Sequence, residues 1–148
     1  MSEQPDRGPL PVWPLRAPGL LIAAGPHAIP ISTAVRAGDR RLILGLARRR
    51  ETLERLRENP RAAFAMLAEG IAFTAYGQAI VVRDKLEDMP NLSAVELRVE
   101  RVQDHLADGR TEMLDQARWR WVDDRAREAD ATVVAEIEAL ARGRAGGS

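Results

Sequence analysis

GLARRRETLERLRENP, residues 45–60, is the stretch from which the rest of this chain can be interpreted. An apolar, strand-like run at 42–44 leads into three consecutive arginines at 48–50. About two turns of amphipathic helix come next, from about Glu51 to Glu58, and Asn59-Pro60 ends them. So short a helix is not stable alone in water, so we expect it to dock on a sheet.

The start of this helix is a candidate phosphate site. Free backbone N–H groups and the positive end of the helix dipole meet there, beside Arg48, Arg49, Arg50 and the hydroxyl of Thr52. Two observations favour a plain surface turn instead: charge runs are usually solvated, and Glu51 would repel a phosphate. No Gly-rich phosphate-binding loop is present, so a phosphate site here would differ from the Walker and dinucleotide-binding types.

Strand-like patterns surround this segment on both sides. A two-residue alternation of apolar and polar residues predicts half-buried strands. A parallel sheet would need a helix between most of these strands, and such helices are absent from the pattern. We therefore predict a mainly β fold, a six-stranded antiparallel barrel with the short inserted helix and a C-terminal helix at about 130–142. The expected strands are 20–24, 27–35, 41–46, 62–67, 71–82 and 93–103.

Single residues refine this prediction. Pro30 cannot donate a ladder hydrogen bond, so its strand should lie at an edge or contain a bulge. Gly77 indicates a bend or a close backbone approach, and the alternation slips near Glu100-Arg101, as it does at a β-bulge. Asp130 or Thr132 is the expected cap of the last helix.

The chain divides into three parts. Residues 1–18 carry five prolines and should form an extended arm, pinned to the body by Trp13. Residues 19–142 should form one domain with its C-terminal helix, and residues 143–148 a flexible tail.

Charge and composition exclude several classes of function. Acidic and basic residues balance at 22 each, so we expect no general attraction to nucleic acid or to anionic lipid. No run is long and apolar enough for a membrane span or signal peptide, and there is no cysteine, which together indicate a cytoplasmic protein. The two histidines lie far apart without clustered acids, so we expect no metal site.

Four segments in this order resemble one known family. GPHAIPISTAV (25–35), RRLILGLARRRETLERLRENPRAAFAM (40–66), FTAYGQAIVV (73–82) and VELRVERV (95–102) resemble the pyridoxamine 5′-phosphate oxidase-like split-barrel proteins, which bind FMN. The resemblance covers about residues 20–105, and its most specific part runs from Leu42 to Arg61.

The resemblance implies a homodimer with two flavins in grooves between the subunits, and a small-molecule redox substrate that the sequence does not identify. It implies that Ser32 and Thr33 lie near the flavin ring, and that Leu46 and Ala47 give backbone contacts to the ring or the ribityl chain. It also implies a phosphate near Arg48, Arg49, Arg50 and Thr52, and a contact from the partner subunit by Trp119 or Trp121.

Departures from the family pattern limit what the resemblance implies. Many members have Ser-Arg-Lys at the phosphate loop, where this chain has Arg50-Glu51-Thr52, and Trp119-Arg120-Trp121-Val122-Asp123 replaces the C-terminal substrate motif. The chain should therefore not be a true pyridoxamine phosphate oxidase. Three readings stay open: an FMN-dependent oxidoreductase without an assigned catalytic residue, a non-catalytic dimeric carrier, sensor or structural module, and a deazaflavin- or heme-binding relative.

A few residues have two interpretations. His27 would suit acid–base chemistry at neutral pH, but a strand-end histidine with satisfied nitrogens is commoner. Trp119 and Trp121 would either cover a ring at a subunit junction or close the core under the last helix. Glu96 and Glu100 alternate with apolar residues and look like an exposed strand face.

Overall fold

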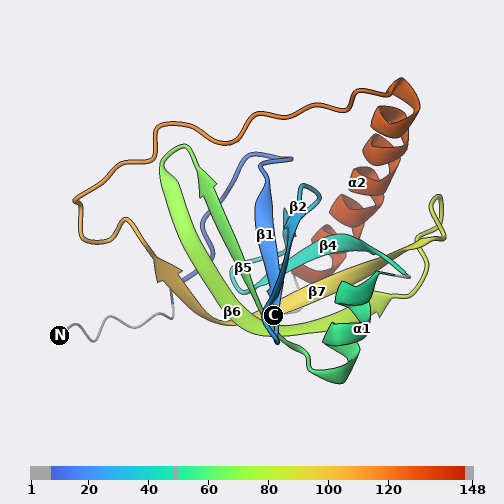
Figure 1. The fold of residues 1–148 in the computed structure, drawn as a ribbon, viewed down its shortest axis with the longest axis horizontal. Coiled ribbons are helices and arrows are strands. Elements are labelled where there is room, and N and C mark those ends of the chain that lie inside the picture. Colours follow the sequence, from blue (N-terminus) through green and yellow to red (C-terminus); the bar gives the residue numbers. More distant parts are fainter. Residues whose placement is uncertain (1–7, 49, 146–148) are drawn as a thin grey trace.

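The computed structural model describes residues 8–48 and 50–145. Within these residues the chain forms one seven-stranded antiparallel sheet and two helices (Figure 1). The strands are β1 Gly19–Ala23, β2 His27–Ile31, β3 Val35–Arg36, β4 Arg41–Ala47, β5 Arg61–Ala68, β6 Ile71–Arg83 and β7 Leu92–Asp104, and the helices are α1 Glu51–Glu58 and α2 Asp124–Ala145.

The order of the strands explains why the sheet curls into a barrel. It runs β2-β1-β5-β6-β7-β4-β3, so β2 and β3 occupy its two edges. Only residues 32–34 separate these two strands in the chain, a span of about 14 Å at most from Ile31 to Val35. The two edges must therefore lie close together. The predicted antiparallel barrel is confirmed, but it has seven strands because the expected strand 27–35 leaves one edge at Ser32 and joins the other.

Two predicted irregularities are present. Pro30 lies in β2, an edge strand. No further strand pairs with the outer side of β2, so a missing N–H on that side breaks no hydrogen bond of the sheet. Between β6 and β7 the register passes from Tyr76–Arg101 to Gly77–Val99, which leaves one residue of β7 as a bulge. A Cβ on Gly77 would lie 1.9 Å from a backbone carbonyl oxygen of β7, so only glycine fits this approach.

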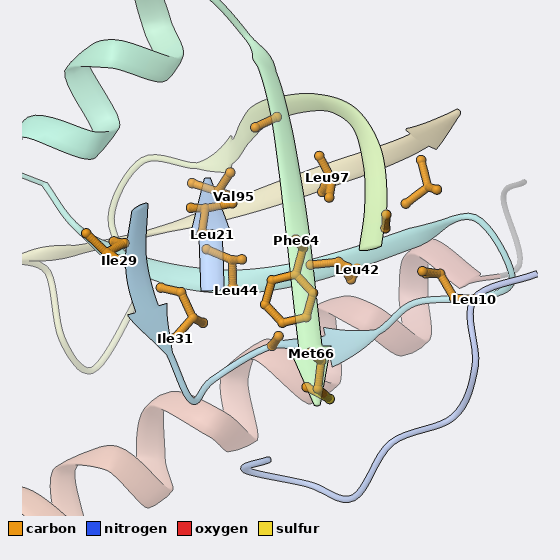
Figure 2. Packing of buried hydrophobic residues seen from close by; sticks show 14 of the residues in the cluster. Leu10, Leu21, Ile29, Ile31, Leu42, Leu44, Phe64, Met66, Val95 and Leu97 are labelled. Atoms are coloured by element: carbon orange, nitrogen blue, oxygen red, sulfur yellow. The ribbon is translucent and has the colours of Figure 1, made fainter. Parts of the chain in front are cut away.

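The barrel interior is filled by apolar side chains from alternate positions of the strands. Figure 2 shows members of this cluster, among them Leu21, Leu44 and Phe64, on β1, β4 and β5.

The N-terminal arm, described from residue 8, closes one end of the interior. Trp13 stacks on Phe73 at a centroid distance of 5.6 Å, and its Nε1 donates to a backbone oxygen 3.1 Å away. The predicted role of Trp13 as a pin for the arm is thus confirmed.

Helix α2 covers the outer face of β4 and forms a second, smaller core with it. Ile43 of β4 and Ile137 of α2 are both fully buried there. The helix begins six residues before the expected start, so Asp130 lies inside it and is not its N-cap. It also continues through Ala145 into the segment expected to be a tail. The early start was missed because the first turns carry mostly exposed polar residues that give no apolar stripe.

A buried carboxylate fastens the C-terminal end of α2 to the sheet. Glu96 of β7 is fully buried beneath the helix, contrary to the exposed face expected from its alternation. Both of its oxygens accept hydrogen bonds from Arg144 of α2, and Arg98 Nε lies 2.8 Å from Oε1. Burial alone raises the pKa of Glu96, but the hydrogen bonds from Arg144 and Arg98 and the charge of Arg41 outweigh it, so the pKa falls below its ordinary value. We call Glu96, Arg98 and Arg144 the clamp.

Candidate functional site

A cavity of about 350 Å³ opens where β2, the end of β4 and the first half of α2 meet. Its volume is within the range of small-molecule sites, and most of its wall is apolar. The ends of β2 and β4 both line it, although these strands lie far apart in the strand order of the sheet, because the curled sheet brings its two edges together. Six predicted cofactor residues line it: Ser32, Thr33, Leu46, Ala47, Arg50 and Trp121.

Ser32 and Thr33 lie in the short link that closes the barrel. Thr33 Oγ1 accepts a hydrogen bond from the backbone N–H of Gly45 at 3.1 Å, which ties the link to β4. The Thr33 hydroxyl hydrogen stays available as a donor, since this bond uses the oxygen only as an acceptor. Within the described part of the chain, the Ser32 hydroxyl has no hydrogen-bond partner, although it borders the cavity.

Arg50 is the N-cap residue of α1, with an extended backbone conformation and no side-chain cap. Its guanidinium is exposed, borders the cavity, and has no hydrogen-bond or ion-pair partner among residues 8–48 and 50–145. Glu51 is paired instead with Arg55, whose Nε lies 2.8 Å from Oε2. The hydrogen bond and charge of Arg55 lower the pKa of Glu51. The carboxylate expected to repel a phosphate is therefore offset by a cation one turn along the helix.

Arg48 is partly engaged elsewhere. Its Nη2 donates to Oδ2 of Asp84 at 3.1 Å, and the other oxygen of Asp84, Oδ1, accepts from Arg57 Nη2 at 3.3 Å. Arg48 Nε is buried and has no hydrogen-bond partner in the described structure. Asp84 was not foreseen from the sequence, because it lies in a polar loop with no local link to the arginines. Arg49 lies outside the described residues.

The structure turns Thr52 away from the cavity. Thr52 lies on the buried face of α1, and its Oγ1 lies 2.8 Å from Nε2 of His27. The hydroxyl is thus occupied by a neighbouring strand. The same contact supports the structural interpretation of His27, as a residue that joins β2 to α1.

The two tryptophans of the C-terminal segment are exposed, Trp119 by 38% and Trp121 by 41%. Neither closes the core. Their rings meet edge to face at 5.7 Å, in the irregular stretch that leads from β7 to α2 (Figure 1). Trp121 borders the cavity, whereas Trp119 donates from Nε1 to the backbone oxygen of Arg16 at 3.0 Å.

Sequence reasoning missed the most buried polar group of the cavity. Asp130 of α2 lines it with a side chain only 7% exposed and forms an ion pair with Arg16 of the N-terminal arm. A signal for its burial was present. Asp130 precedes Val133 and Ile137 by three and seven residues, and these spacings share one face of a helix.

The chemistry of the lining is limited. Its described residues include no histidine, cysteine or tyrosine, and Arg50 and Asp130 are its charged groups. No group of three or more His, Cys, Asp and Glu side chains in the described ranges could hold a metal ion. A helix with the length and apolar character to cross a membrane was not found in those ranges either.

No family model matches this chain, and no curated protein matches it. Solved structures do. A Listeria innocua protein provisionally assigned as a pyridoxamine 5′-phosphate oxidase aligns with TM-score 0.51 and 16% identity, over 60% of this chain and 88% of its own. An F420 reductase aligns with TM-score 0.51 and 13% identity, over 60% and 90%. A heme-binding protein from Mycobacterium smegmatis aligns with TM-score 0.50 and 20% identity, over 61% and 49%.

Proposed function

The chain has the split-barrel fold of the pyridoxamine 5′-phosphate oxidase-like proteins, and from this premise we propose that it binds FMN as a small flavin-dependent oxidoreductase. The proposal does not include oxidation of pyridoxamine phosphate, since the family's substrate motif has no counterpart here. One observation carries it. Predicted residues from three separated parts of the sequence, at 32–33, within 46–50 and at 121, border a single cavity.

The polar groups of the cavity suit a ligand with an apolar ring and an anionic end. Arg50 offers an unpaired guanidinium at the start of α1, where free N–H groups also gather. Arg48, two residues before Arg50, does not line the cavity, but its buried Nε is a donor without an acceptor. Ser32 and Thr33 offer hydroxyl donors for the ring, and Leu46 an apolar surface. Thr52, held by His27, is not counted among the phosphate ligands in this proposal.

Heme suits the cavity less well than a flavin. Heme iron in proteins is held by His, Cys, Met or Tyr side chains, and Met89 is the one such side chain in the described lining. A deazaflavin cofactor shares the ring and the phosphate, so the same residues would serve it. The F420 reductase with this fold makes that cofactor the second candidate.

When bound, FMN would supply hydride or electron transfer, while the protein fixes its position and its access to solvent. No described lining residue other than Asp130 is a candidate acid or base. The small number of acid–base groups in the lining, together with the Thr52 hydroxyl that already bonds His27, favours a non-catalytic carrier or sensor as the alternative function.

We also propose that the protein is a homodimer. The segment 105–123 exposes large apolar side chains, among them Leu114 at 77% and Val122 at 97%. Exposed apolar groups on one segment are typical of an interface. Sedimentation equilibrium tests the dimer, and a strictly monomeric species with bound flavin would contradict it.

The visible spectrum of the purified protein, followed by titration with FMN and with F420 under flavin fluorescence, tests the cofactor. We expect yellow protein or saturable quenching by FMN. A colourless protein that binds neither compound would end the proposal. Bleaching of the bound flavin by a nicotinamide donor, and its recovery with an acceptor, would distinguish an oxidoreductase from a carrier.

A further inference from the structure

We propose that Asp130 is a ligand-recognition residue, which selects for compounds that present an N–H hydrogen-bond donor inside the cavity. The inference rests on the proposed function for the identity of the ligand, and on the geometry of Asp130 for the chemistry. Arg16 is the residue that positions it.

Asp130 has more hydrogen-bonding capacity than it uses. Its side chain is more than nine-tenths buried and lines the cavity, and its one partner among residues 8–48 and 50–145 is Arg16, through Oδ2. An ionised carboxylate has about four acceptor sites on two oxygens. Buried polar groups in proteins are nearly always hydrogen-bonded. Oδ1 has no partner among these residues and is not fully enclosed, so it is available to a donor that a ligand brings into the cavity.

Arg16 is held in place from two sides. It is the one non-glycine residue in the described structure with a positive φ, 71°, which is a sparsely populated conformation. Its guanidinium pairs with Asp130, and its backbone oxygen accepts from Trp119 Nε1. Unusual backbone conformations persist where the surroundings impose them, often beside binding sites. The arm, the segment before α2 and α2 itself thus meet at this pair and fix the carboxylate at the cavity wall.

The ligand class follows from charge. A fixed carboxylate favours imide, amide and amine N–H donors and disfavours a second anionic group. Such a donor has two sources. It is either the ring imide of the flavin or an amine on a substrate bound beside it.

Two probes distinguish these sources in wild type, Asp130→Ala and Glu136→Ala. The first is FMN against FMN methylated at N3, which lacks the imide N–H. The second is benzylamine, titrated by calorimetry into the protein with and without FMN. Glu136 is the matched control: it is a carboxylate of the same helix with a side chain 10% exposed, but it bonds Arg83 outside the cavity.

We expect Asp130→Ala to reduce either the preference for FMN over its N3-methyl form or the affinity for benzylamine by about tenfold or more, as for a charged hydrogen bond. Glu136→Ala should leave both unchanged. A lost FMN preference identifies the ring imide, and a lost amine affinity identifies a substrate. If Asp130→Ala and Glu136→Ala behave alike with both probes, the inference is overturned.

Two checks keep the test decisive. If Asp130→Ala fails to fold, the nearly isosteric Asp130→Asn replaces it, and circular dichroism confirms its fold. If wild type binds no FMN, the proposed function fails, but benzylamine binding to the protein alone still decides the role of Asp130.

Discussion

Two buried carboxylates, one beneath helix α2 and one on it, differ in the number of partners they have. Glu96, near the C-terminal end of the helix, accepts from Arg144 through both oxygens and from Arg98 as well. Asp130, in the first half of the helix, has Arg16 alone and borders the cavity. Both residues are almost completely buried, so burial does not separate them.

The difference teaches how a structural charge and a recognition charge can be told apart. In the clamp the polar groups satisfy one another, so that nothing is left for a ligand. Around the cavity, Arg50, Ser32 and Asp130 each retain unused hydrogen-bonding capacity. We therefore expect changes in the clamp to alter stability and not ligand binding, and a change at the exposed Arg50 to do the reverse.

The largest expected effect on stability comes from Arg144→Met. This change keeps the apolar stem but leaves Glu96 buried with Arg98 as its remaining hydrogen-bonded cation. Removal of one partner from a buried ion pair costs about 3 kcal/mol of unfolding free energy, measured by urea denaturation. FMN affinity should not change. A loss of affinity without a loss of stability would reverse the roles given to the clamp and the cavity.

Local signals carried most of the fold prediction. The helix bounds at Glu51 and Glu58 were confirmed because a basic turn and Asn59-Pro60 mark them in the sequence. The bulge at Glu100 was confirmed because a three-residue step in the alternation has no other simple cause. The division of 27–35 into two edge strands was not predicted, since it depends on how the whole sheet closes.

Part of the cavity lining was named from the family resemblance. Leu46 and Ala47 lie at the end of β4 and border the cavity, and their contact with a cofactor stays a prediction. The partners Asp84 for Arg48 and Arg16 for Asp130 join segments 36 and 114 residues apart. No pattern within one segment contains such pairs, so they emerge only from the packed fold.

Arg50→Ala should weaken FMN binding by about 1.5–3 kcal/mol, the range of a charged hydrogen bond. Stability should stay within about 0.5 kcal/mol, because the side chain is exposed. Arg57→Ala is the control, since Arg57 is also an exposed arginine of this region but bonds Asp84 and does not line the cavity. Equal FMN affinity in wild type and Arg50→Ala, by fluorescence titration, would remove Arg50 from the site.

Gly45→Ala should affect both properties slightly and so mark where the two regions meet. Gly45 lines the cavity, and a Cβ there would lie 3.3 Å from Cδ1 of Ile137 in α2. The end of a flexible side chain can give way, so we expect a loss of about 1 kcal/mol in unfolding free energy and a small loss of FMN affinity. Both are measured on the same preparation, and an effect on affinity alone would show that α2 adjusts without strain.

The smallest expected effect is a pH dependence of the clamp. The pKa of Glu96 in the folded protein lies below its ordinary value of 4.5, because Arg144 and Arg98 stabilise the ionised form more than burial disfavours it. A lowered carboxyl pKa stabilises the fold above the unfolded pKa, and the contribution disappears as pH falls through the folded pKa. The difference in unfolding free energy between wild type and Glu96→Gln should thus be constant near neutrality and narrow below about pH 4.5. Other carboxyl groups titrate in both proteins and cancel in this difference. If the difference in unfolding free energy between the two proteins stays constant down to pH 3, hydrogen-bond geometry, and not the charge of Glu96, holds the end of α2.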